Sequence, residues 1–126
     1  DAAFKMFLDN PWLGVGPGNY GTIFPLYFPS ALQDQATWHS AHNLYLHQLA
    51  ERGLAGLVVL LGVLCALTRR AYTRVQERPT PLNLWAFSGL AAFWVMNLTE
   101  VAFQNEQIST LLIFIWVWAE TAHDRK

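Results

Sequence analysis

Residues 53–68, GLAGLVVLLGVLCALT, contain no charged side chain and limit the environments in which this chain can fold. Extended upstream to Leu49, the stretch reaches the roughly 20 apolar residues that a helix needs to cross a bilayer. Glu51 and Arg52 then lie at the membrane interface. We therefore predict a transmembrane helix over residues 49–68.

Two further apolar stretches follow, over residues 82–103 and 108–122. The first contains one acid, Glu100, near its end, and the second is the shortest of the three. Alone, the last stretch also fits a buried helix of a soluble protein, but beside two stronger segments it favours another crossing. We predict transmembrane helices over 82–103 and 107–122.

The composition agrees with a membrane protein. Hydrophobic residues make up 53% of the chain and charged residues 13%, whereas soluble domains average about 25% charged residues. The net charge of −1 gives no basic field for nucleic acid, and the lone Cys65 cannot form an internal disulfide. The chain opens with Asp1 and has no signal peptide pattern. We expect residues 1–126 to be the C-terminal part of a longer protein.

The placement of positive charge predicts the orientation. Six of the eight Lys and Arg residues lie after the first or the third apolar stretch, namely Arg69, Arg70, Arg74, Arg78, Arg125 and Lys126. Three crossings put both groups on one side, which the positive-inside rule assigns to the cytoplasm. Residues 1–48 and the link 104–107 then face outward, which in a bacterium is the periplasm or cell exterior, and we expect a multi-pass membrane protein.

The outward segment, residues 1–48, divides into a helix and a loop. Ala3, Phe4, Phe7 and Leu8 have helical spacing, which predicts a short amphipathic helix that ends at Asn10-Pro11. Residues 13–30 then contain four glycines and three prolines, a composition typical of loops and turns. We expect this loop to lie on the membrane or in a groove.

The loop contains GPGNYG, residues 16–21, which formally matches the G-x-G-x-x-G pattern. A dinucleotide site needs a strand before the pattern and a long helix after it, and the surrounding residues favour neither. We interpret the pattern as a tight turn whose glycines allow positive φ or close backbone approach. Such a turn places Gly16, Gly18, Asn19 and Tyr20 against a substrate or against the helix that follows Ser40.

Three of the four histidines, His39, His42 and His47, fall within nine positions. Their spacing does not give the paired ligands of a zinc site, so we predict no metal. They are either polar residues at the mouth of a membrane helix or include a catalytic base. We predict that a helix begins at Ser40, a favourable N-cap residue, and continues unbroken to about Gln76.

In that helix, His42 occupies the first turn. Unpaired N–H groups and the positive end of the helix dipole disfavour the imidazolium form there. A neutral imidazole can accept a proton, and the same helix end favours a phosphate oxygen. His42 is therefore the candidate base for a reaction on a lipid-linked phosphate.

Neighbouring residues have candidate supporting roles. Asn43 can orient a neighbouring loop or hydroxyl, or support the helix start, and Tyr45 lies on nearly the same face as His42. Glu51 can pair with His47 at i, i+4, and Gly53 together with Gly56 favours close helix packing.

Three polar residues, Asn97, Thr99 and Glu100, lie at the outward end of the second predicted crossing. An acid within a membrane helix marks a functional site by default. Glu100 is close to the interface, however, where a solvated carboxylate is also compatible with the sequence.

The segment AHNLYLHQLAERGLAGL, residues 41–57, resembles the signature of the O-antigen ligase and Wzy-type polymerase superfamily. In that signature a His-Asn pair opens a helix, and an acid-x-Gly step leads into a membrane span. NPWLGVGPGNYGTIFPLY, residues 10–27, resembles the segment that precedes this pair. The resemblance implies an all-α, integral membrane helical bundle that needs no metal or other cofactor.

The resemblance also implies a function: transfer or polymerisation of undecaprenyl-diphosphate-linked glycan in the biosynthesis of cell-surface polysaccharide such as lipopolysaccharide O-antigen. His42 would take the proton from the hydroxyl of a glycan, lipid A-core or protein acceptor. The expected substrate contacts are Asn43, Tyr45, Gly16, Gly18, Asn19 and Tyr20. The expected supporting residues are His39, Glu51 and Gly53.

The chain departs from the family's pattern in one respect: Lys5 is the only basic residue before His42. Family members hold the donor diphosphate with arginines in earlier loops, so the resemblance implies a clamp upstream of residue 1. Without it, this chain alone is expected to be inactive, because a base needs a positioned substrate.

Ligase, polymerase and protein glycosyltransferase activities stay open. Two readings from other classes also stay open. One is a transporter or channel segment that uses Glu100, Asn97 and the histidines as a proton or solute path. The other is a membrane scaffold without chemistry, for which replacement of His42 is silent.

Overall fold

The computed structural model describes residues 2–29 and 40–101 and, of the last apolar stretch, only Thr110, Ile113, Phe114 and Val117. Four helices make up this part of the chain: α1 (Ala2–Asp9), α2 (Tyr20–Tyr27), α3 (Leu44–Glu77) and α4 (Pro81–Met96). It contains no strand, which confirms the all-α prediction. The predicted third crossing, 107–122, lies outside the described residues apart from those four positions.

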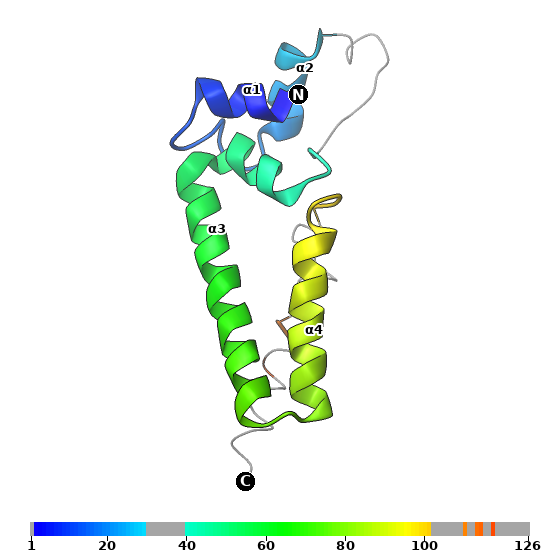
Figure 1. Cartoon of the computed structure of the whole chain (residues 1–126). Helices are drawn as coiled ribbons and strands as arrows, with labels where there is room; N and C mark the ends of the chain where they lie inside the picture. Colours follow the sequence, from blue (N-terminus) through cyan, green and yellow to red (C-terminus); the bar gives the residue numbers. More distant parts are fainter. Residues whose placement is uncertain (1, 30–39, 102–109, 111–112, 115–116, 118–126) are drawn as a thin grey trace.

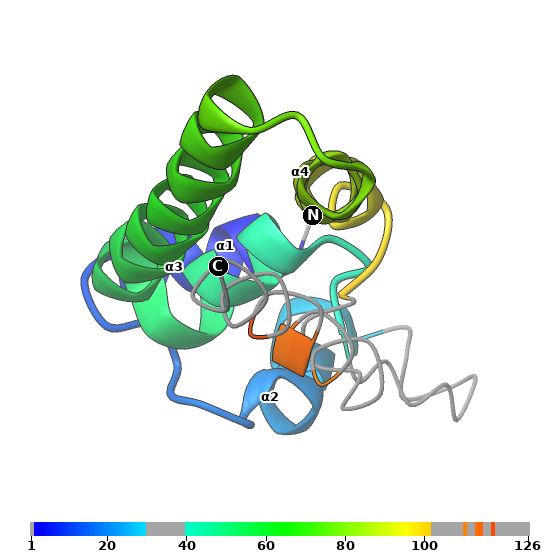
Figure 2. The same cartoon turned by 90° about the horizontal axis from the view of Figure 1, so that it is seen from below.

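Helices α3 and α4 form an antiparallel pair, and α1 and α2 lie across the end where α3 begins (Figure 1). From below, α4 is seen nearly end-on while α3 is inclined to it (Figure 2). The pair is joined where buried Leu64 of α3 contacts Phe93 of α4. The Trp94 indole N–H also donates to the Thr68 hydroxyl at 3.0 Å.

Helix α3 is broken at Gly53, whose φ of 61° and ψ of −161° are not helical. We call residues 44–52 the short arm and residues 54–77 the long arm. In Figure 1 the short arm lies across the top of the pair and the long arm runs down it. The prediction of an unbroken helix was therefore wrong, although its end at Glu77 lies next to the predicted Gln76.

The loop after α1 supplies the hydrogen bonds that the break removes from α3. A helix break leaves carbonyls before it and N–H groups after it without helical partners. Four backbone bonds satisfy them: Val15 N to Ala50 O (2.8 Å), Gly16 N to Glu51 O (2.9 Å), Leu54 N to Pro11 O (2.8 Å) and Ala55 N to Trp12 O (3.2 Å). Two segments about 40 residues apart in sequence thus share one hydrogen-bonded junction.

The predicted helix at the N-terminus is confirmed as α1, which ends at Asp9. Of the apolar residues whose spacing predicted it, Ala3 is buried, while Phe4 and Leu8 are 46% and 58% exposed; Met6 is buried beside Ala3. The buried pair packs with Tyr20 of α2 and Ala50 of the short arm. Small and unbranched side chains let these helices approach closely, and the bulkier residues face outward.

The loop predicted over residues 13–30 contains a two-turn helix, α2, with Pro25 inside it. Pro25 lacks an N–H and removes one helical hydrogen bond. Tyr20 is buried, and Ile23, Phe24 and Tyr27 pack against the same core as α1. Tyr27 also donates to the Asp9 carboxylate at 2.6 Å, so tertiary contacts stabilise a helix that composition disfavours.

Helix α4 begins with Thr80 as N-cap, whose hydroxyl accepts from Asn83 N, and with Pro81 in the first turn. It ends at Met96, short of the predicted Phe103. Asn97 is fully buried at this end, and its amide N–H donates to Phe93 O at 2.7 Å. A side chain that binds the last turn of its own helix terminates it there.

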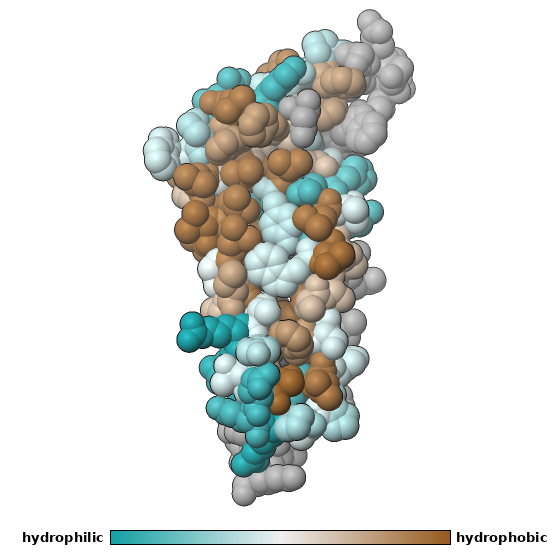
Figure 3. Space-filling model, viewed as in Figure 1, coloured by the Kyte–Doolittle hydropathy of each residue, from teal (hydrophilic) through white to brown (hydrophobic). Residues whose placement is uncertain are grey.

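The surface of the pair is apolar along most of its length. Large exposed apolar side chains include Leu54, Val58, Val59, Val63, Leu84, Trp85 and Val95. Figure 3 shows brown, hydrophobic surface over the upper part of α3 and teal, hydrophilic surface toward the end where α3 passes into α4. Within the described residues, Leu44–Glu77 is the one helix long and apolar enough to cross a membrane.

Candidate functional site

The candidate site lies where the short arm begins. His42 precedes the helix and has a φ of 48°, a left-handed conformation that non-glycine residues adopt rarely. Asn43 is the N-cap, and its side-chain oxygen accepts from Leu46 N at 3.0 Å. The prediction of a start at Ser40 was wrong, so His42 lies before the cap and outside the first helical turn.

The turn after α4 is bonded to this helix start. Leu44 N donates to Asn97 O at 3.0 Å, and the Asn43 side-chain amide donates to Leu98 O at 2.9 Å. Asn43 therefore caps its own helix and fixes a neighbouring turn, two of the roles that the sequence left open. As a result, the Glu100 carboxylate comes within 3.9 Å of the His42 Nδ1 atom.

Tyr45 points toward α4. Its hydroxyl donates to Trp94 O at 3.0 Å, and its ring stacks on the Trp94 ring with centroids 6.1 Å apart. The contact fastens the short arm to α4. The substrate contact expected of Tyr45 stays a prediction.

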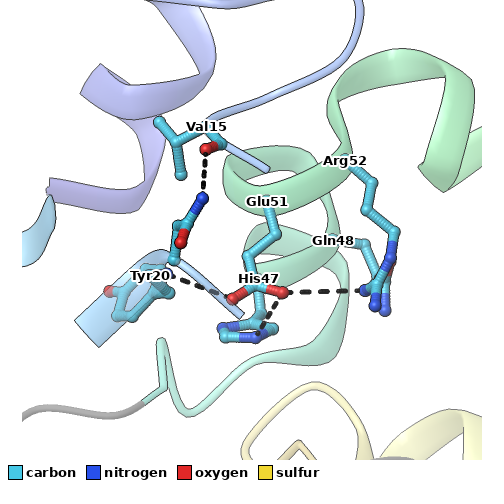
Figure 4. A network of polar contacts seen from close by, with 7 residues as sticks. Val15, Tyr20, His47, Gln48, Glu51 and Arg52 are labelled. Atoms are coloured by element: carbon cyan, nitrogen blue, oxygen red, sulfur yellow. Dashed lines mark hydrogen bonds and ion pairs between the residues drawn. The ribbon is translucent and has the colours of Figure 1, made fainter. Parts of the chain in front are cut away.

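A second cluster lies further along the short arm and is buried (Figure 4). His47 and Glu51 are 1% and 3% exposed, and His47 Nε2 lies 3.6 Å from a Glu51 oxygen. The predicted His47–Glu51 pair is thus confirmed. The other Glu51 oxygen accepts from Tyr20 N at 3.1 Å, and the Tyr20 ring lies against His47. Glu51 therefore joins the short arm to the first turn of α2.

The pKa of His47 is lowered from its ordinary value, chiefly because burial disfavours the charged imidazolium. Glu51 opposes this shift and Arg52 adds to it. His47 belongs to the short arm, before the break and outside the apolar run. Neutral His47 acts as a packing and pairing residue, with Tyr20 and Glu51 as its neighbours.

Arg52 lies at the polar end of an open groove of about 1070 Å³. Its guanidinium donates to Gln48 at 2.9 Å and lies 3.7 Å from Glu51. The groove is bounded by the turn at residues 13–17 and by the apolar face of the long arm, including Val59 and Val63. From the sequence we expected Arg52 at the membrane interface, but no sequence pattern around Arg52 indicated the groove.

The glycine turn has the predicted backbone, with φ of 100° at Gly16 and 75° at Gly18. The Asn19 amide donates to Val15 O at 3.0 Å and closes the turn on itself. The closest approach to the short arm is made by Gly14, where an added Cβ would collide with the backbone of Glu51. Substrate contacts at Gly16, Gly18, Asn19 and Tyr20 stay predictions.

Gly53 was expected to allow close packing between helices, but it packs against the loop. An added Cβ at Gly53 would meet the Trp12 backbone, and its positive φ alone disfavours any side chain. Gly14 and Gly53 thus form both sides of one backbone contact. The Glu-x-Gly step, Glu51 to Gly53, is the place where the loop docks.

The two described histidines of the trio have different surroundings, and His39 lies outside the described residues. His42 precedes the short arm and lies near Glu100, whereas His47 is buried within the short arm beside Glu51 and Tyr20. Among the described side chains, no group of three or more His, Cys, Asp or Glu residues is arranged to hold a metal ion.

The part of the chain that forms α1, α2, the short arm and the start of the long arm matches a family model. This model is described as O-antigen ligase, and it covers residues 1–61. The match supports membership of residues 1–61 in the O-antigen ligase superfamily. The family is membrane-associated and indicates a glycan ligase or polymerase type of enzyme in cell-surface polysaccharide biosynthesis. No curated protein and no solved structure matches the chain.

Proposed function

We propose that this chain activates the acceptor in an enzyme that transfers glycan from undecaprenyl diphosphate to an acceptor hydroxyl. The proposal assigns the role of general base to His42. One observation carries it: His42 is held at a positive φ and remains exposed, at the end of the family-matched short arm that is bonded to α4. Strained backbone that the fold maintains is concentrated at functional sites.

The reaction needs one base and one leaving group. A neutral His42 imidazole takes the proton of the acceptor hydroxyl while the oxygen attacks the anomeric carbon of the donor sugar. The bond between that carbon and the diphosphate oxygen breaks, and the lipid diphosphate leaves with the electron pair. The acceptor is a second glycan, a lipid A-core sugar or a protein hydroxyl.

The diphosphate must lie within a few ångströms of the anomeric carbon, because the two are joined by one oxygen. Arg52 is at the other end of the short arm from His42, after a helical rise of about 12 Å. We infer that cations other than Arg52 hold the reacting diphosphate. This agrees with what the family resemblance implies, a clamp upstream of residue 1.

We further propose that the long arm crosses the inner membrane of a bacterium and places His42 at its periplasmic or outer face. The exposed apolar side chains of the long arm support this. Four arginines, Arg69, Arg70, Arg74 and Arg78, lie toward the opposite end of the long arm. Positive charge at that end favours the cytoplasm.

The test uses the full-length protein in bacterial membranes and the variant His42→Asn. Asparagine tolerates left-handed φ, so the fold is expected to be retained. Loss of the base should lower glycan transfer at least about 100-fold. Transfer of labelled glycan from undecaprenyl diphosphate is measured at matched amounts of protein.

Thr99→Ala is the control, because Thr99 is an exposed polar residue on the same turn as Glu100. It should keep transfer within about twofold of wild type. Equal transfer by His42→Asn and wild type would reject the catalytic assignment. It would leave a scaffold or a transport segment as the better description.

A further inference from the structure

We propose that Glu100 is a positioning residue that fixes the orientation and tautomer of the His42 imidazole, an inference that rests on the function proposed above. The Glu100 Oε2 atom lies 3.9 Å from His42 Nδ1. This separation is longer than a hydrogen bond. Both side chains are more than half exposed, 60% for His42 and 64% for Glu100. Catalytic hydrogen bonds are often long before substrate binds.

The proximity of Glu100 to His42 is determined by how the two backbone segments that carry them are held together. The turn that carries Glu100 is held to the helix start that carries His42 by two hydrogen bonds, at Asn43 and Leu44. These bonds join residues more than 50 positions apart in the sequence. Asn97, which accepts one of them, is fully buried. The fold therefore presents this carboxylate to this imidazole.

The left-handed backbone of His42 supports the same conclusion. A φ of 48° costs a non-glycine residue conformational free energy, and glycine or asparagine would avoid that cost. With this φ, His42 lies beside the turn at the end of α4, and its Nδ1 is the ring atom nearest Glu100.

The chemical consequence follows from the two ring nitrogens. A carboxylate at Nδ1 favours the tautomer with the proton on Nδ1, which leaves the Nε2 lone pair free to accept the acceptor's proton. The same carboxylate stabilises the imidazolium that forms as the proton arrives. Glu100 keeps its own charge throughout, so no further proton is transferred.

The test compares Glu100→Gln with Glu100→Asp in the full-length protein in membranes. Glu100→Gln should lower kcat about 10- to 100-fold, as for other residues that orient a functional histidine, with KM within twofold. Glu100→Asp should restore part of the rate. Glu77→Gln, the same charge change at the far, exposed end of α3, is the control.

A double variant separates positioning from structural support. If Glu100 acts through His42, then Glu100→Gln should cause no further loss in the His42→Asn background. Full additivity, or a kcat of Glu100→Gln equal to that of Glu77→Gln, would overturn the inference while the proposed function stands. Transfer by His42→Asn equal to that of wild type would overturn the proposed function, and the inference with it.

Discussion

At the scale of single residues, positive φ values mark the positions on which the arrangement depends. Gly53 turns the chain between the two arms of α3, and His42 turns it into the short arm. Gly53 has no side chain to collide with the loop, whereas His42 occupies a conformation that glycine or asparagine adopts more easily. The glycine serves the fold, and the histidine serves the proposed chemistry.

Replacing Gly53 should therefore undo the junction between loop and helix. Gly53→Ala places a Cβ against the Trp12 backbone at a φ of 61°, and we expect a loss of at least about 2 kcal/mol of stability. Gly62→Ala is the matched control. Gly62 lies within the long arm with no atom near its Cβ position, and alanine there should stabilise the helix by up to about 1 kcal/mol.

The measurement is the unfolding midpoint of both variants in detergent, together with the protease sensitivity of residues 10–16. We expect Gly53→Ala, but not Gly62→Ala, to have a lower unfolding midpoint than wild type and to be cleaved in this loop. Equal midpoints for the two variants would show that the junction does not stabilise the protein.

At the scale of elements, the short arm connects α1, α2 and the loop between them to α4. One end of it is held by α1, α2 and the loop through Ala50 and Glu51. The other end is held by α4 through Asn43 and Tyr45. A change in the docking of either end should therefore alter the position of His42.

Acid should weaken the first of these attachments. The pKa of His47 in the folded protein is lowered by burial, so below the ordinary histidine pKa of about 6.5 the unfolded chain binds a proton that the folded chain does not. The stability contributed by neutral His47 is present above that pH and is lost as pH falls toward the lower folded value. The groups against His47 are Glu51 and Arg52 on its own arm and the Tyr20 ring of α2.

We expect the temperature midpoint of unfolding in detergent to decrease as the pH is lowered from 7.5 to 5. His47→Gln should be less stable than wild type at pH 7.5, but its unfolding midpoint should decrease less when the pH is lowered. Parallel pH profiles for the two proteins would contradict the assignment of this dependence to His47.

The sequence correctly predicted those features that depend on interactions between residues close together in the chain. The end of α1 before Asn10-Pro11, the Asn43 contribution to a helix start and the His47–Glu51 pair all follow from short-range spacing. The positive φ at Gly16 and Gly18 does too. The helical class follows from the apolar runs.

What the sequence did not predict depends on partners far along the chain. The break at Gly53 is stable because the loop at residues 11–16 satisfies its backbone groups, and α2 forms despite Pro25 because its side chains are buried. The approach of Glu100 to His42 requires that α4 end at Asn97. Each of these partners is more than one helical turn away in the sequence from the residue that it affects, so a local pattern does not reveal it.

At the scale of the whole molecule, the described residues form a cap of short helices on an apolar helical pair. The cap contains α1, α2 and the short arm, and it lies at one end of the pair (Figure 1). The long arm, residues 54–77, rises about 35 Å, which matches a hydrocarbon core of about 30 Å. With the crossing proposed above, this length would put His42 at one membrane surface and Arg74 and Arg78 at the other.

Cysteine labelling tests that placement, since the chain has a single cysteine, Cys65, exposed on the long arm. In a full-length protein that keeps no other cysteine, Cys65 should resist a membrane-impermeant maleimide from both sides, because the reagent does not enter the hydrocarbon core. With Cys65→Ser added, Gln76→Cys should react only in inside-out vesicles and Thr99→Cys only in spheroplasts. Reaction of Cys65 in intact membranes would exclude a crossing by the long arm. Reaction of Gln76→Cys in spheroplasts would reverse the orientation and place His42 on the cytoplasmic side, away from the proposed site of glycan transfer.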